Sequence, residues 1–141
     1  MIVLDTNVIS EVFRSSPNEH VVAWLEALTG DVAITAVTLA ELLAGVARLP
    51  DGRRMDELSS RVEAAIEPFR GTRSILAFDD TAASHYAGVL RAREASGHPI
   101  STADAQIAAI CLAHEATCAT RNTRGFAHTG VGLLDPWGSA A

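Results

Sequence analysis

The segment Ile2-Val3-Leu4-Asp5-Thr6-Asn7 changes from apolar to polar at Asp5. A short run that is apolar at every position is typical of a strand buried on both faces, as in the middle of a parallel sheet. Asp, Thr and Asn are favoured at helix N-termini, so a helix should start directly after this strand. The segment therefore predicts a central strand over residues 2–4 with a carboxylate at its carboxyl end.

Helical and strand patterns alternate along the rest of the chain, and no repeat or linker interrupts them. This alternation predicts a single α/β domain over residues 1–141, a three-layer sandwich in which helices flank a mostly parallel sheet of short strands. We expect the further strands at residues 32–34, 74–78, 117–120 and 132–134. We expect the helices at residues 7–16, 18–28, 37–49, 53–67, 79–96 and 102–115.

The composition of the 141 residues, 48% hydrophobic and 20% charged, is that of a globular domain. The formal net charge is −6, and all 11 basic residues are arginine. Because lysine is absent, Schiff-base chemistry and the lysine-containing phosphate-binding loop are excluded. The acidic balance argues against a broad basic surface, so a nucleic acid would have to be bound through metal ions and locally placed arginines.

Cys111 and Cys118 lie in apolar stretches without C-x-x-C spacing, so we expect two buried thiols and no zinc site. The five histidines show no metal-binding spacing and are not expected to be catalytic. The longest apolar stretch, residues 32–49, contains Glu41 and Arg48 and is too polar to span a membrane. Without a basic leader before an apolar run, the sequence predicts a cytoplasmic protein with no membrane partner.

Four polar residues stand out because they follow predicted strands or lie on helices that start near strand ends: Asp5, Glu41, Asp104 and Asn122. Ligands bind beyond the carboxyl ends of the strands in open α/β sheets, so these side chains should meet there. Helix capping explains Asp5, Asp104 and Asn122 equally well, and Glu41 could be a solvated surface residue. If the carboxylates do meet, an all-oxygen ligand set suits Mg²⁺ or Mn²⁺.

Five segments together resemble the PIN-domain ribonucleases, and within them the VapC-type toxins of toxin–antitoxin pairs, in their FitB-like branch. The most specific segment is Thr102-Ala103-Asp104-Ala105-Gln106-Ile107-Ala108-Ala109-Ile110. The other segments are Ile2 to Val8, Thr38 to Leu42, Ala119 to Thr123 and Gly130 to Trp137, so the resemblance covers almost the whole chain.

The resemblance implies a PIN-like sheet flanked by helices and an Mg²⁺-dependent endoribonuclease in which metal-activated water cleaves RNA. It implies that Asp5, Glu41 and Asp104 hold the Mg²⁺ or Mn²⁺ ion and that Thr6 supports the site near Asp5. Asn122 would complete the catalytic set by orienting water. Relatives often carry an acid where this chain has Gly125, and the absence of that acid argues against a second fully liganded ion.

Arg14, Arg121 and Arg124 lie close in sequence to the site-bearing segments, so they are candidates for binding RNA phosphates. Each could equally be a solvated surface residue. The resemblance further implies a VapB- or FitA-like antitoxin that covers the acidic site, a homodimer, and a larger toxin–antitoxin assembly. The polar helix at 53–67 and the apolar stripe of 37–49 are candidate antitoxin-facing surfaces, although the stripe could be core.

Two other enzyme classes also place an aspartate after the first strand: haloacid dehalogenase-type phosphohydrolases and response-regulator receiver domains. Both require a lysine, and the phosphohydrolases require a second aspartate where this chain has Asn7. The alternative that remains is a PIN-fold protein with weak or no catalysis, which acts only by binding its antitoxin or a nucleic acid.

Overall fold

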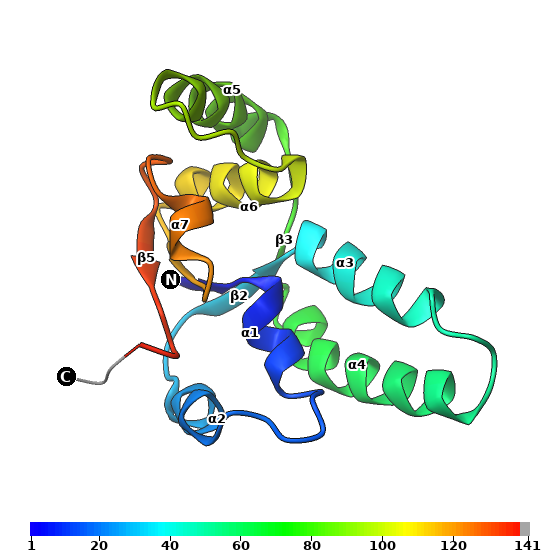
Figure 1. The fold of residues 1–141 in the computed structure, drawn as a ribbon. Coiled ribbons are helices and arrows are strands. Elements are labelled where there is room, and N and C mark those ends of the chain that lie inside the picture. Colours follow the sequence, from blue (N-terminus) through cyan, green and yellow to red (C-terminus); the bar gives the residue numbers. More distant parts are fainter. Residues whose placement is uncertain (139–141) are drawn as a thin grey trace.

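The computed structural model describes residues 1–138 and contains a five-stranded, fully parallel sheet with the strand order β3-β2-β1-β4-β5 (Figure 1). β1 lies in the middle of this sheet, as the apolar run at the start of the chain predicts. The last residues of the predicted domain, 139–141, lie outside the described part. The strands are β1 Ile2–Leu4, β2 Val32–Thr35, β3 Ile75–Leu76, β4 Thr117–Ala119 and β5 Gly132–Leu134.

Helices cover both faces of the sheet, so the predicted three-layer α/β fold is confirmed (Figure 1). Val3 and Cys118 face a core built with α5 and α6, whereas Leu4 and Ala119, one residue further along, face a core built with α1 to α4. The helices are α1 Thr6–Glu11, α2 Glu19–Ala27, α3 Ala36–Ala47, α4 Arg53–Gly71, α5 Asp80–Ala95, α6 Thr102–Ala113 and α7 Thr123–Phe126.

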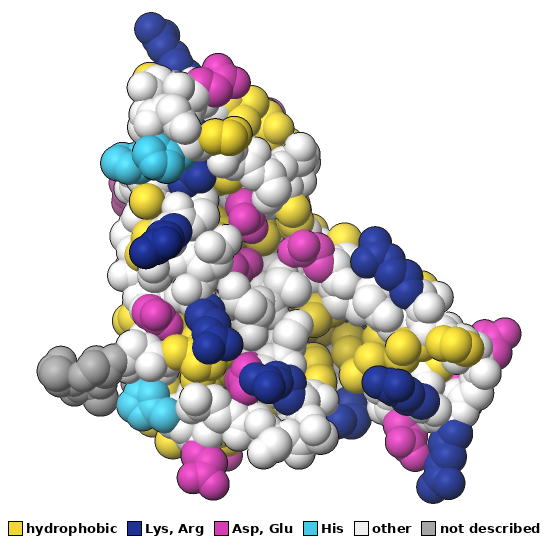
Figure 2. Space-filling view, viewed as in Figure 1, with side chains coloured by type: hydrophobic (Ala, Val, Ile, Leu, Met, Phe, Trp, Pro, Cys, Tyr) yellow, Lys and Arg dark blue, Asp and Glu magenta, His cyan; other side chains and the backbone are white. Residues whose placement is uncertain are grey.

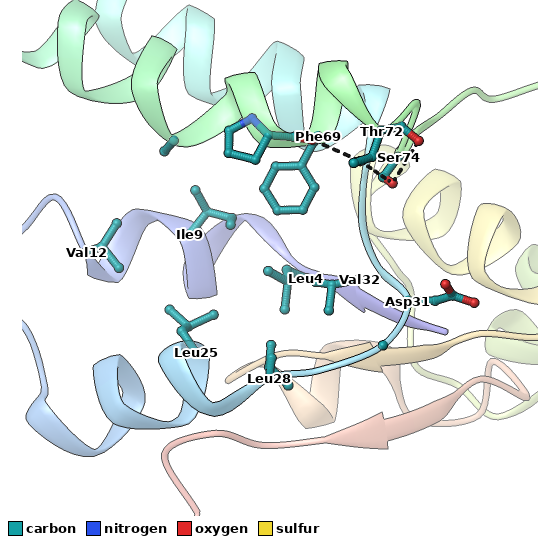
Figure 3. Close-up of a pocket in the computed structure, with 13 residues that line it drawn as sticks. Leu4, Ile9, Val12, Leu25, Leu28, Asp31, Val32, Phe69, Thr72 and Ser74 are labelled. Carbon is teal, nitrogen blue, oxygen red and sulfur yellow. Dashed lines mark hydrogen bonds between the residues drawn. The ribbon is translucent and has the colours of Figure 1, made fainter.

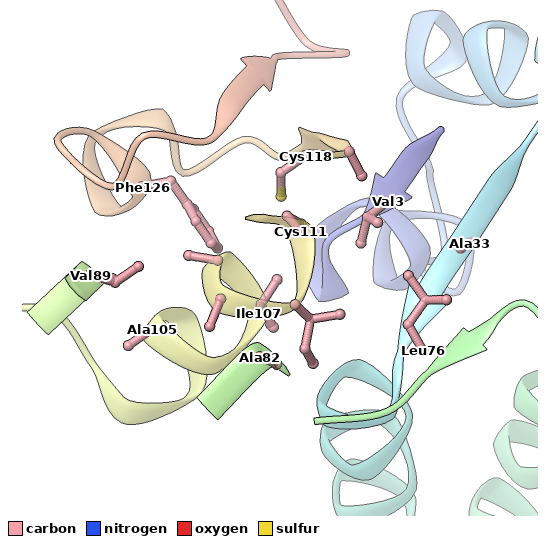
Figure 4. Packing of buried hydrophobic residues seen from close by; sticks show 14 residues of the cluster. Val3, Ala33, Leu76, Ala82, Val89, Ala105, Ile107, Cys111, Cys118 and Phe126 are labelled. Atoms are coloured by element: carbon pink, nitrogen blue, oxygen red, sulfur yellow. The ribbon is translucent and has the colours of Figure 1, made fainter. Parts of the chain in front are cut away.

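The core on the α6 side is made largely of small residues (Figure 4). Ala105, Ala108 and Ala109 are fully buried, which lets α6 pack close to α5 and to the sheet. Cys111 and Cys118 are free and buried, as predicted. A hydrogen bond with Cys111, together with burial, raises the pKa of the Cys118 thiol, so the pair behaves as small apolar side chains.

Three elements differ from their predicted lengths by three residues or more. α1 ends at Glu11 and not at residue 16, because the Glu11 carboxylate accepts a hydrogen bond from the backbone N–H of Asn18 (2.8 Å) and turns the chain back. α4 continues through Pro68 to Gly71, and Thr72 closes its end by donating two hydrogen bonds to the Pro68 carbonyl. β3 is only two residues long.

α7 is the element that the sequence patterns do not predict. It is a single turn of four residues, too short to show helical periodicity. The Asn122 side chain caps it by accepting a hydrogen bond from the N–H of Gly125 (3.1 Å), and Phe126 anchors it in the core.

The apolar stripe on α3 is mostly core. Leu42 and Val46 are buried against Val62 and Ile66 of α4, so that part of the stripe cannot serve as an outer surface, whereas Leu43 is 40% exposed. Within residues 1–138, no helix combines the length and the apolarity needed to cross a bilayer.

Candidate active site

Asp5 is the acid at the carboxyl end of the central strand. It follows β1 directly and is only 4% exposed. Its Oδ1 accepts a hydrogen bond from the N–H of Thr6 (2.8 Å), and its Oδ2 accepts from the hydroxyl of Thr120 (2.7 Å) and from Nδ2 of Asn7 (3.1 Å). Asp5 is therefore the N-cap of α1 and at the same time a fixed carboxylate at the carboxyl edge of the sheet.

Thr120 and Asn7 orient Asp5, and sequence reasoning assigned neither of them this role. β1 and β4 pair with Leu4 opposite Ala119, so the next residues, Asp5 and Thr120, are neighbours across the two strand ends. The expectation that β4 lies beside β1 would have been enough to identify Thr120. Asn7 also accepts a hydrogen bond from the backbone N–H of Arg121 (3.2 Å), which ties α1 to the segment after β4.

Thr6 lies between Asp5 and Glu41. The Thr6 hydroxyl donates a hydrogen bond to Oε1 of Glu41 (2.7 Å) and also contacts the hydroxyl of Thr38 (3.0 Å). Glu41 is exposed on α3, and this hydrogen bond directs its carboxylate towards the start of α1. Thr6 thus links the segment after β1 to α3.

Asp104 and Asn122 contact each other. Asp104 is half-buried in the first turn of α6, where Ser101 accepts a hydrogen bond from its N–H (3.2 Å). Nδ2 of Asn122 donates to Oδ2 of Asp104 at 3.5 Å, a long contact. Asn122 is also the N-cap of α7, so capping and a place in the site coexist for Asn122 as they do for Asp5.

The carboxylates repel one another. Burial, the largest cause, and the negative charges of Asp104 and Glu41 raise the pKa of Asp5 to about 6, against the hydrogen bonds from Thr120 and Thr6, which lower it. Burial and then the charge of Glu41 raise the pKa of Asp104. A cation placed among these groups would offset the repulsion.

The donor set fits a hard divalent cation, because it consists of carboxylate and amide oxygens only. Among the described residues, no three carboxylate, thiol or imidazole side chains converge closely enough to hold an ion by themselves. Mg²⁺ commonly keeps several waters and takes only one or two protein carboxylates, so two of the acids with water complete a suitable shell.

Gly125 leaves space for the Asn122 side chain. A Cβ at position 125 would lie only 2.1 Å from Nδ2 of Asn122, so no other residue fits there while Asn122 keeps this conformation. An acid at position 125 and the present Asn122 conformation therefore exclude each other.

The three candidate RNA-binding arginines are exposed, and the side chains of two of them contact other side chains. Arg14 pairs with the buried Glu11 carboxylate (3.3 Å), Arg121 lies over the ring of Trp137 (5.1 Å to its centre), and Arg124 belongs to α7. Figure 2 shows acidic side chains in the hollow between the α5–α6 side and the α3–α4 side of the molecule, with arginine side chains around it.

Two cavities lie beside α1. A cavity of about 280 Å³ between α1, α3 and α4 is lined by Thr6 and Glu41 and by apolar residues such as Phe13 and Leu58. A larger one, of about 620 Å³, lies between α1, α2 and the end of α4 and is mostly apolar (Figure 3). Neither Asp5 nor Asp104 lines the larger cavity, so it is separate from the acidic site.

Comparison with known proteins matches residues 2–132 to the PIN domain. The chain belongs to the PIN-domain family. Among its relatives, the toxin FitB of Neisseria gonorrhoeae is 45% identical over 138 residues, which cover 97% of this chain and 99% of that protein. The VapC ribonuclease Y4jK of Sinorhizobium fredii is 39% identical over 97% of this chain and 98% of that protein.

A solved structure of FitAB bound to an IR36 DNA fragment contains a similar chain, with a TM-score of 0.92 and 43% identity. The match covers 100% of this PIN-domain chain and 99% of that one. The resemblance inferred from the sequence motifs is thereby confirmed at the level of family and fold.

Proposed function

We propose that residues 1–141 form one PIN domain that acts as a metal-dependent endoribonuclease, the toxin of a type II toxin–antitoxin pair. The observation that carries the proposal is that Asp5, Glu41 and Asp104 lie near enough to one another, at the carboxyl edge of the sheet, for their charges to repel. The 39% identity to a protein named as a VapC ribonuclease supports the choice of RNA as the substrate.

Asp5 and Asp104 would hold Mg²⁺ or Mn²⁺, and Glu41, held by Thr6, would bind a water of the ion. When bound, the cation supplies positive charge that acidifies water and stabilises the charge that develops on the phosphate. The hydrogen bonds to Asp5 from Thr120 and Asn7 keep its carboxylate in one orientation through the reaction. The Asn122 amide, which contacts Asp104, would orient the attacking water.

Arg14, Arg121 and Arg124 would hold the phosphates that flank the cleaved bond. Arg121 follows Thr120, which contacts Asp5, and Arg124 lies two residues beyond Asn122, so both are on segments that carry site residues. A local set of exposed guanidinium groups lets a chain with a net charge of −6 bind RNA without a basic surface as a whole.

The antitoxin would bind over the cavity between α1, α3 and α4. This cavity combines apolar walls with the Glu41 carboxylate, so it suits a partner that inserts an apolar side chain and brings an arginine or lysine to the acids. The name of the relative FitB as a toxin and the similar chain in a FitAB complex support a partner of this kind. We further propose a cytoplasmic location and a homodimer within the toxin–antitoxin assembly.

The test measures cleavage of a mixed RNA by the purified chain in Mg²⁺ and in EDTA, and the 5′ ends of the products are sequenced. The two conditions show whether cleavage depends on a divalent cation. We expect cleavage in Mg²⁺ only, and a loss of at least about 100-fold for Asp5→Asn and for Asp104→Asn. Asp51→Asn changes an exposed loop acid remote from the site and is the matched control. Cleavage that persists at the wild-type rate in both site variants would contradict the proposal.

A binding protein without catalysis is the second candidate, because no three ligand side chains within residues 1–138 converge on one point. Calorimetry with Mn²⁺ separates the two candidates. A chain that binds an antitoxin but shows no heat with Mn²⁺ and no cleavage would support the second.

A further inference from the structure

Arg93 is a buried arginine in the last turn of α5, and sequence reasoning assigned no role to it. The residue is only 5% exposed. Among the described residues, no carboxylate lies within 4.0 Å of its guanidinium, so the charge of Arg93 has no ion-pair partner there. An arginine side chain stays protonated in proteins, so the charge must be stabilised by dipoles.

Five backbone carbonyls provide that stabilisation, and they come from two separate segments. Nε of Arg93 donates to the carbonyl of His98 (2.6 Å), and Nη2 donates to that of Pro99 (3.1 Å). Nη1 donates to the carbonyls of Arg124 (3.1 Å), Gly125 (3.0 Å) and Ala127 (2.7 Å). A lysine could not make these five hydrogen bonds, because its ammonium group lacks the planar, forked donors of a guanidinium.

Each of the two segments leads to a site residue. Residues 98–100 run into Ser101, the N-cap of α6, and α6 carries Asp104 in its first turn. The other segment is α7 with its last carbonyls, and Asn122 is the N-cap of α7. One guanidinium therefore binds both the segment before Asp104 and the helix after Asn122.

The contact between Asp104 and Asn122 is sensitive to the positions of these two segments. Their side chains are 3.5 Å apart, at the limit of a hydrogen bond, so a shift of a few tenths of an ångström would break the contact. α7 is one turn long and cannot be stable alone, and its end carbonyls need donors from elsewhere. Arg93 supplies those donors.

We propose that Arg93 is a positioning residue of the active site, which sets the separation of Asp104 and Asn122 by binding the two segments that carry them. The proposal rests on the proposed function, since it treats Asp104 as a metal ligand and Asn122 as the residue that orients water. It assigns Arg93 a role in metal affinity beyond its contribution to stability.

The variant test uses Arg93→Lys, with Arg91→Lys as the matched control on the exposed side of the same helix. Circular dichroism first establishes that the variants are folded at the temperature used. We expect Mn²⁺ affinity by calorimetry to fall about tenfold in Arg93→Lys, with the KM for RNA unchanged within about twofold. The Gly125 amide, which is bonded to Asn122, should exchange its hydrogen faster. Lower thermal stability with unchanged Mn²⁺ affinity would overturn the proposal.

A second measurement needs no variant. In a Mg²⁺ titration of the wild-type chain followed by NMR, the Nε–H of Arg93 and the side-chain amide of Asn122 should shift with one midpoint, and the Nε–H of Arg91 should not shift. An Asn122 shift without an Arg93 shift would overturn the proposal. If Mg²⁺ binds with these shifts but RNA is not cleaved, only the proposed function fails. If Mg²⁺ does not bind, both fail.

Discussion

Asp5 and Arg93 are both buried and charged, and within residues 1–138 neither has an ion-pair partner, yet their surroundings are opposite in kind. Arg93 donates to five carbonyl oxygens from two segments. Asp5 accepts three hydrogen bonds but also faces the negative charges of Asp104 and Glu41. The environment of Arg93 is complete, whereas that of Asp5 has an excess of negative charge.

The buried charge of Arg93 therefore stabilises the fold, whereas the buried charge of Asp5 destabilises it. Strongly shifted pKa values and like-charge neighbours are concentrated at functional sites. The raised pKa of Asp5 therefore supports its place in the proposed site, and the satisfied guanidinium of Arg93 fits the supporting role that we propose for it. Opposite responses to mutation, pH and cations follow from this comparison.

The largest effect is expected from removal of the Arg93 guanidinium. Arg93→Met leaves five backbone carbonyls without their donors, so we expect the free energy of unfolding to fall by on the order of 4 kcal/mol. Urea denaturation measures it. Arg91→Met on the exposed side of α5 should change it by about 0.5 kcal/mol or less. Equal effects of the two variants would show that the buried contacts contribute nothing.

The second prediction concerns pH. The pKa of Asp5 is raised from 3.8 to about 6 in the folded chain, so the folded state holds a proton that the unfolded state has lost. Without metal, this contribution to stability is present below about pH 4 and disappears as the pH rises through 6. Relative to Asp5→Asn, the wild-type chain should therefore lose about 3 kcal/mol of unfolding free energy between pH 3 and pH 7. Parallel pH profiles of the two proteins would contradict the shift.

A divalent cation should reverse this loss. At pH 7.5, Mg²⁺ at about 100 times its dissociation constant should stabilise the wild-type chain by about 2.7 kcal/mol, because it binds the folded state only. Thermal unfolding with and without Mg²⁺ measures the effect, with Ca²⁺-free buffer throughout. Asp5→Asn should show less than a quarter of the effect, and Asp51→Asn should show all of it. An equal gain in Asp5→Asn would place the ion elsewhere.

The smallest effect is expected at Gly125, whose carbonyl also binds Arg93. In Gly125→Ala the new Cβ would lie 2.1 Å from Nδ2 of Asn122, so the Asn122 side chain must move and the cap of α7 is lost. We expect a destabilisation of about 1 kcal/mol by urea denaturation. In an Asn122→Ala background, where the side chain is already absent, the same change should have almost no further effect. Additive effects would show that the two positions do not compete for space.

Short-range signals were enough for β1, Asp5 and the segment around Asp104. The apolar run of residues 2–4 predicts the central strand because a short run that is apolar at every position is typical of a strand buried on both faces. α7 escaped prediction because one turn has no periodicity. Arg93 had a signal that could have been used: it continues the spacing of Ala82, Tyr86 and Val89, which pack into the core.

The sequence by itself determined the order of all strands and helices except α7, the family, and the acids that lie near the carboxyl edge of the sheet. These features depend on local pattern and on motifs within a few residues. The tertiary structure alone decided what surrounds each charge. Thr120 reaches Asp5 across 115 positions of the chain, and Arg93 reaches the end of α7 across 31 to 34 positions. Contacts over such distances arise from strand pairing and helix packing, so no local pattern encodes them.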